Sequence, residues 1–281
     1  MPLSHLFSPI KIGSVDLKNR IALAPVDAGL HGPTGEVTDR YIDFLVERVK
    51  GDTGLIITEF TTVWPEKRVI TTSVWDDTFI PGLARMAEAV KQAGAPIFMQ
   101  IAALGGKSYV EPFAPSAVDS PLYEQVPREM TVDDIKRMIE AFIKGAERAQ
   151  RAGFDGVEYH CAHSYLGGQF ISPHTNRRDD EYGGDFERRM RFGTEIVTGI
   201  QQVCGDDFPI GFKFSAHEHL HGGVNDRYDH GENDGLHLKV ARHMADLGVV
   251  YLHVATTSST IMQVKGFVEC THPSVPPMYI K

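Results

Sequence analysis

Residues 131–160 read TVDDIKRMIEAFIKGAERAQRAGFDGVEYH, and this stretch indicates the fold class. Its first part predicts a helix over 131–152, because Thr131 and Asp134 have the spacing of a capping box and Gly153 is a typical helix end. The short apolar run at 156–160 then predicts a buried strand. A helix followed at once by a buried strand is the repeating unit of a parallel α/β fold.

The same alternation runs along most of the chain. Buried parallel strands are predicted at 21–25, 55–60, 97–101, 156–160, 210–215 and 249–255. Helices are predicted at 39–50, 79–93, 131–152, 187–203 and 234–247. No G-x-G-x-x-G follows the first strand, and long segments follow the third, fourth and fifth strands, as in the active-site loops of a barrel. The sequence therefore predicts an α/β fold of the TIM (β/α)8-barrel type, with a small hairpin at 8–18 before the first strand.

The number of predicted strands falls short of a full barrel. Only six are found where such a barrel has eight, and the chain ends in the proline-rich THPSVPPMYIK, which predicts irregular structure. We therefore expect one barrel domain over residues 1–281 with only its first six strands present, incomplete at the C-terminus. One consequence is an alternative function: an inactive barrel that needs a partner segment.

Composition excludes several classes of protein. A formal net charge of −9 disfavours nucleic acid and anionic membrane as partners. No apolar run reaches the roughly 20 residues of a membrane span, and the N-terminus lacks a signal-peptide pattern. Three cysteines are too few and too scattered for a disulfide scaffold or a zinc site. These features predict a cytoplasmic protein.

His160, His163 and Tyr165 lie within six residues where the fourth predicted strand ends. Barrel enzymes keep their catalytic groups at this end of the strands. From the residues alone three interpretations stay open: a structural pair of histidines, a metal site or a catalytic site. A metal needs a third ligand, and Glu59 is the one obvious candidate, so no metal is expected.

The segment 160–192, HCAHSYLGGQFISPHTNRRDDEYGGDFERRMRF, resembles the signature of the Old Yellow Enzyme family of FMN-dependent oxidoreductases. The branch it resembles lies near the 2,4-dienoyl-CoA reductases and NADH:flavin oxidoreductases. The family pattern H-A-A-H-G-Y-L…Q-F-x-S-P…N-x-R-x-D-x-Y-G-G…E-N-R-x-R-F is matched in register from His160 to Phe192. Weaker matches extend over nearly the whole chain.

The resemblance implies a set of site residues. The flavin contacts would be Pro25, Val26, Asp27, Phe60, Gln100, His160 and Lys213. His160 and His163 would hydrogen-bond the substrate carbonyl, and Tyr165 would be the proton donor. The implied cofactor is FMN, with NADH or NADPH as reductant.

The implied reaction is reduction of an activated C=C bond in an enone, enal or enoyl thioester. Two donors aimed at the conjugated oxygen would act as an oxyanion hole, and a neutral tyrosine can deliver a proton. A second possibility is an amine dehydrogenase or demethylase on the same fold. The partner is a small-molecule substrate, and a homo-oligomer is possible.

Four departures from the family pattern bear on flavin chemistry. Asp27 replaces threonine or cysteine, and Phe60 replaces a small residue. Ala103 stands at the position of the family histidine in a segment that also lacks its arginine, and Lys213 replaces arginine. The lysine keeps the positive charge but loses the bidentate guanidinium.

Overall fold

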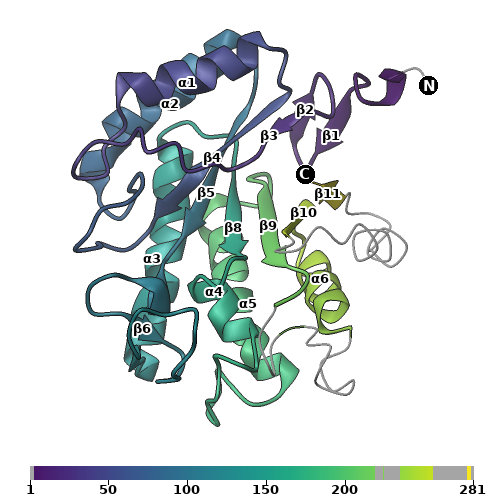
Figure 1. Cartoon of the computed structure of the whole chain (residues 1–281). Coiled ribbons are helices and arrows are strands. Elements are labelled where there is room, and N and C mark those ends of the chain that lie inside the picture. The colour runs from purple at the N-terminus through teal and green to yellow at the C-terminus, as the bar shows by residue number, and fades with distance from the viewer. Residues whose placement is uncertain (1–2, 219–223, 225–234, 256–276, 280–281) are drawn as a thin grey trace. The chain divides into compact units, whose positions relative to one another are not determined.

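The main sheet of the computed structural model has seven strands, in the order β11-β10-β9-β8-β5-β4-β3 (Figure 1). The residues described by the structure are 3–218, 224, 235–255 and 277–279. The strands are β3 (Ala22–Leu23), β4 (Leu55–Thr62), β5 (Ile97–Ala102), β8 (Gly156–Cys161), β9 (Ile210–Ser215), β10 (Tyr251–Ala255) and β11 (Pro277–Tyr279). Strand β4 pairs in parallel with β3, and β10 pairs in parallel with β9 and β11. Neighbours in the sheet follow chain order without reversal, as in a barrel and unlike a doubly wound sheet.

A helix follows each strand of the main sheet from β3 to β9, as the sequence predicted. The helices are α1 (Asp39–Lys50), α2 (Ile80–Ala93), α3 (Val132–Arg151), α5 (Phe186–Cys204) and α6 (Leu236–Asp246). Short 3-10 turns are η1 (Leu3–His5), η2 (Asp77–Phe79) and η3 (Gly105–Lys107). None of the helices within the described part of the chain is long and apolar enough to cross a membrane.

The capping box predicted for α3 is present. The Thr131 hydroxyl accepts a hydrogen bond from the Asp134 N–H at 3.1 Å, and the Asp134 carboxylate accepts one from the Thr131 N–H at 3.0 Å. Gly153 follows the helix with φ of +85°, where a Cβ would be strained. The predicted hairpin is also confirmed: β1 (Ile10–Ile12) pairs antiparallel with β2 (Val15–Leu17).

Some elements differ from the prediction. The first strand is only Ala22–Leu23, because Pro25 has no N–H to extend the ladder. The tail predicted to be irregular contains β11, whose Pro277 takes the first position of the strand, where proline is tolerated. A two-stranded pair, β6 (Phe113–Ala114) with β7 (Arg128–Glu129), and the short helix α4 (Leu166–Ile171) were not predicted.

The chain divides into two compact units, each with its own core. The first unit contains 1–101, 141–158 and 200–210, and the second contains 102–140, 159–199 and 211–281. In the first unit, Leu55, Ile56 and Ile57 of β4 are at most 1% exposed. In the second unit, the rings of Phe170 and Phe192 stack with centroids 4.1 Å apart.

Candidate active site

His160, His163 and Tyr165 form a compact triangle in the second unit. The His160 ring lies 5.3 Å from the His163 ring and 5.0 Å from the Tyr165 ring, and the third side is 6.5 Å. His160 is the penultimate residue of β8 and is 2% exposed, whereas His163 and Tyr165 belong to the turn that leads into α4. The structure therefore brings together the three side chains that the sequence singled out.

The turn between β8 and α4 holds an uncommon backbone conformation. His163 and Ser164 have φ of +56° and +57°, in the left-handed region that residues other than glycine seldom adopt. The His163 N–H donates to the Ser215 hydroxyl at the end of β9, at 3.1 Å. Such conformations persist only where the surroundings stabilise them, and they are concentrated at functional sites.

The hydrogen bonds of His160 fix its tautomer. Its Nδ1 accepts the N–H of Ala162 at 3.1 Å, so the proton of the neutral ring is on Nε2. Burial lowers the pKa of His160 well below its usual value, and the positive charge of Lys213 lowers it further. The ring is therefore a neutral hydrogen-bond donor through Nε2 at physiological pH.

The surroundings of His163 also lower its pKa, as they do for His160. Burial of its ring lowers its pKa to about 4, with further lowering by Lys213 and Lys107. His253, on β10, also lowers the pKa of both site histidines. Both imidazoles are therefore neutral at pH 7, and the charges around them favour an anionic ligand.

Lys107, at the end of η3, is a member of the site that the sequence analysis did not identify. Its ammonium lies 4.9 Å from the centroid of the Tyr165 ring and donates to the His163 carbonyl at 3.2 Å. Burial lowers its pKa, which is the sign expected for a cation taken partly out of water. The signal for it was a cation directly after Gly105 and Gly106, where the family histidine and arginine are missing.

A short helix packs against this turn through glycine. A Cβ on Gly167 would lie 2.4 Å from Cys161 Sγ, and one on Gly168 would lie 2.5 Å from the Cys161 carbonyl oxygen. Both separations are impossible for real atoms, so only glycine allows α4 to approach the end of β8 this closely. The approach fixes Tyr165, which is the N-cap residue of the helix.

The loop that follows α4 is held by side-chain hydrogen bonds to the backbone. The Asn176 side chain donates to the carbonyls of Phe170 and Tyr182, each at 2.8 Å. The Arg178 guanidinium binds the Asp180 carboxylate and donates to the Met130 carbonyl. These bonds hold the turn that precedes α5.

The resemblance also implied flavin contacts on the first, second, third and fifth predicted strands. In the first unit, Pro25, Val26 and Asp27 come directly after β3, with Val26 47% exposed, and Phe60 is buried on β4. Gln100 on β5 is buried, and its amide donates to the Glu158 carboxylate at 2.5 Å. Lys213 is buried on β9 in the second unit. Residues 215–234, which contain four histidines in the sequence, lie mostly outside the described residues.

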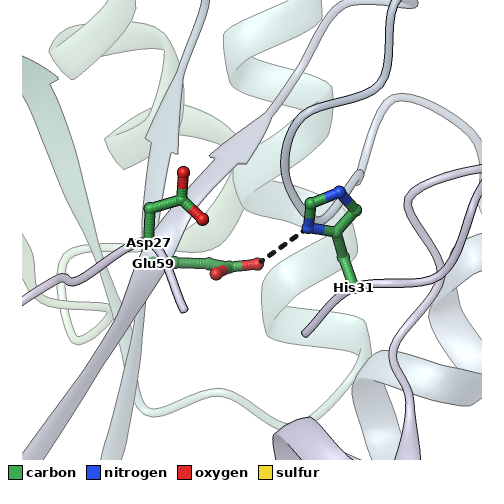
Figure 2. A group of neighbouring side chains, drawn as sticks. All are labelled: Asp27, His31 and Glu59. Atoms are coloured by element: carbon green, nitrogen blue, oxygen red, sulfur yellow. Dashed lines mark ion pairs between the residues drawn. The ribbon is translucent and has the colours of Figure 1, made fainter. Parts of the chain in front are cut away.

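Asp27 and Glu59 form a second cluster, together with His31 (Figure 2). Their potential ligand atoms lie within 4.8 Å of one another. Burial raises the pKa of the Glu59 carboxyl, and the nearby Asp27 charge raises it further. The sequence offered Glu59 as a third ligand for a metal at His160 and His163. In the structure, Glu59 lies with Asp27 and His31.

Comparison with known proteins identifies the family. The model of the NADH:flavin oxidoreductase / NADH oxidase family matches residues 5–265. The chain belongs to this family. It is an FMN-dependent oxidoreductase family with NADH or NADPH as reductant, and the predicted relation to Old Yellow Enzyme is confirmed.

Individual relatives agree with this assignment. An NADH oxidase of Thermoanaerobacter brockii is 41% identical over 260 residues, which are 89% of this chain and 39% of the relative. An NADPH dehydrogenase of Bacillus subtilis is 37% identical over 249 residues, 87% of this chain and 71% of the relative. The solved structure of an old yellow enzyme homologue from Zymomonas mobilis has a TM-score of 0.85 at 26% identity, covering 98% of this chain and 82% of that one. The chain thus spans about two fifths of the first relative's length and most of the other two, and it has their barrel-type fold.

Proposed function

We propose that this chain reduces the activated C=C bond of an enone, enal or enoyl thioester, with NAD(P)H as reductant, FMN as cofactor and Tyr165 as proton donor. The observation that carries the proposal is the triangle of His160, His163 and Tyr165, with two neutral imidazoles in surroundings of positive charge.

The residues assigned to FMN have chemistry that suits its ring. Gln100 is held by Glu158 through its amide N–H, so its carbonyl oxygen can accept from a ring N–H. Lys213 is a buried cation of the kind that stabilises negative charge on a reduced flavin. Pro25, Val26, Asp27, Phe60 and His160 complete the proposed contacts. When bound, FMN supplies the hydride that is added to the alkene β-carbon.

The protein's own groups manage the charge that develops on the substrate. Negative charge accumulates on the conjugated oxygen, and His160 donates to it through Nε2–H while His163 is the second donor. One such donor is worth about 3–4 kcal/mol in comparable sites. Lys107 and Lys213 stabilise the same negative charge at longer range, because both already oppose protonation of His163.

Tyr165 completes the reaction. Its phenol can deliver a proton to the α-carbon as the enolate collapses. One hydride and one proton are then added across the double bond, which becomes a single bond. The imidazoles hold the oxygen and the phenol provides the proton, so each group has one task.

Steady-state assays with two substrate classes test the proposal. The FMN-loaded chain should oxidise NAD(P)H in the presence of 2-cyclohexenone and should leave N-methylated amines unchanged. Oxidation of the amines with no turnover of the enone would replace our assignment with an amine dehydrogenase.

A further inference from the structure

Asp27, His31 and Glu59 form a cluster in the first unit that the proposed reduction does not use as a unit. Asp27 and His31 come from the segment between β3 and α1, and Glu59 comes from the middle of β4 (Figure 2). His31 Nδ1 lies 4.0 Å from Glu59 Oε1, and all three potential ligand atoms lie within 4.8 Å of one another.

Two carboxylates meet a single imidazole in this cluster, and His31 pairs with Glu59 at 4.0 Å when its ring is protonated. Within the described part of the chain, no lysine or arginine forms an ion pair with Asp27 or Glu59, and the Glu59 side chain is 0% exposed. Two carboxylates with one imidazole therefore carry a charge of about −2 when the ring is neutral. Asp27 is exposed, but Glu59 is buried, and a buried carboxylate is normally paired with a cation or bound to a metal.

His31 supplies an independent indication of a ligand. Its Nδ1 is buried and has no hydrogen-bond partner among the described residues, although the side chain as a whole is 16% exposed. The 4.0 Å separation from Glu59 is too long for a hydrogen bond. A buried ring nitrogen beside the Glu59 carboxylate is therefore left to be satisfied by something else.

The two carboxylates retain free coordination positions. Glu59 Oε1 accepts from the Thr72 hydroxyl at 2.7 Å and the Thr72 N–H at 3.3 Å, while Oε2 accepts from the Ala28 N–H at 3.2 Å. Asp27 Oδ1 accepts from the Gly29 N–H, and no hydrogen bond from a described residue reaches its Oδ2. Each carboxylate oxygen has two lone pairs, so Glu59 Oε2 and Asp27 Oδ2 can each bind an ion.

We propose that Asp27, His31 and Glu59 bind one divalent first-row transition-metal ion, such as Zn²⁺. Ligand atoms at about 2.0–2.2 Å from a tetrahedral zinc ion lie about 3.3–3.6 Å from one another. The observed 4.0 Å between His31 Nδ1 and Glu59 Oε1 must therefore shorten by about 0.5 Å, and the outer bound of 4.8 Å by about 1.3 Å, when an ion binds. One imidazole with two carboxylates is a donor set for Zn²⁺ or Mn²⁺, whereas Mg²⁺ prefers oxygen alone.

Equilibrium dialysis of the purified full chain against Zn²⁺, with excess Mg²⁺ present and metal measured by mass spectrometry, tests this site. The chain has 13 histidines, so adventitious zinc must be separated from the site by matched variants. Asp27→Asn and His31→Gln remove a ligand each, while Asp16→Asn and His5→Gln change exposed residues of the same unit and serve as controls. Glu59 is not altered, because its bonds to Ala28 and Thr72 hold the loop to the strand.

The proposal predicts one bound ion in the parent chain and in both controls. Zinc affinity should fall at least about tenfold in Asp27→Asn and in His31→Gln. Circular dichroism confirms that the variants are folded, and His31→Gln decides the matter if Asp27→Asn is not. Absence of a bound ion in the parent, equal affinity in all five proteins, or displacement of zinc by Mg²⁺ would overturn the proposal. Because the readout is bound metal, it is independent of whether the chain reduces alkenes.

Discussion

Replacing Tyr165 with phenylalanine tests the proton donor with the smallest change to the site. The substitution removes one hydroxyl and keeps the ring, which carries the 5.0 Å contact with His160 and the 4.9 Å contact with the Lys107 ammonium. The backbone bond from the Tyr165 N–H to the Ala162 carbonyl is unaffected. The variant should therefore fold and bind FMN as the parent does.

The expected loss follows from the neighbours that remain. His160 and His163 are neutral at pH 7, because the pKa of the first lies well below its usual value and that of the second is about 4. Neither ring therefore carries a spare proton that could replace the phenol. General acid catalysis contributes about 10²–10⁴-fold. Alkene reduction should slow by that factor, which corresponds to about 2.7–5.4 kcal/mol on the barrier.

Anaerobic stopped-flow absorbance separates the two half-reactions. In Tyr165→Phe, reduction of the flavin by NAD(P)H should proceed at the parent rate and serve as the internal control. Reoxidation by 2-cyclohexenone should show the full loss. A variant whose reoxidation rate stays within about threefold of the parent would refute the role of Tyr165, since that is under 1 kcal/mol.

Three further predictions concern the groups around Tyr165. Alanine at His160 or at His163 should weaken the binding of phenols, which mimic the enolate oxygen. The charge-transfer band between the phenol and oxidised flavin should then fade, and an undiminished band would show that neither histidine binds the substrate oxygen. Lys107→Met should raise the pKa of His163 above about 4, because a repelling positive charge is lost. A titration of the histidine resonances by NMR measures this pKa, and a pKa that fell or stayed constant would contradict the prediction. The same variant should weaken anionic ligands more than neutral ones, by about 1 kcal/mol or more as expected for a partly buried charge, and an equal effect on both in calorimetry would argue against an electrostatic role.

Much of the fold was predictable because its signals are local. Thr131 and Asp134 form the predicted capping box, and Gly153 ends the helix in the left-handed conformation. Apolar runs of four to eight residues correctly marked the buried parallel strands. The hairpin at 8–18 followed from simple alternation of apolar and polar residues.

The elements that sequence reasoning missed depend on contacts between distant residues. The sequence LGGQFI resembles a loop because glycine disfavours helices, yet α4 forms there since Gly167 and Gly168 pack against Cys161. Strand β11 lies in a proline-rich tail and is stabilised by pairing with β10. Local propensity does not contain either contact.

The candidate site also has a part that the sequence predicts and a part that only the structure shows. His160, His163 and Tyr165 are close in sequence, so their grouping could be predicted, and the resemblance supplied their roles. Lys107 is 56 residues from His163, with which it forms a hydrogen bond, and Glu59 is 28 residues from its neighbour His31. These partners are far apart in the chain, and only the folded structure shows that they are neighbours.

A single-turnover measurement tests the central claim most directly. The FMN-loaded chain is reduced with one equivalent of NADPH without oxygen and then mixed with one equivalent of 2-cyclohexenone, and the flavin absorbance and the products are measured together. Our account predicts that the absorbance of oxidised flavin returns while cyclohexanone forms in equal amount. A flavin that remains reduced, or that is reoxidised without formation of cyclohexanone, would contradict it.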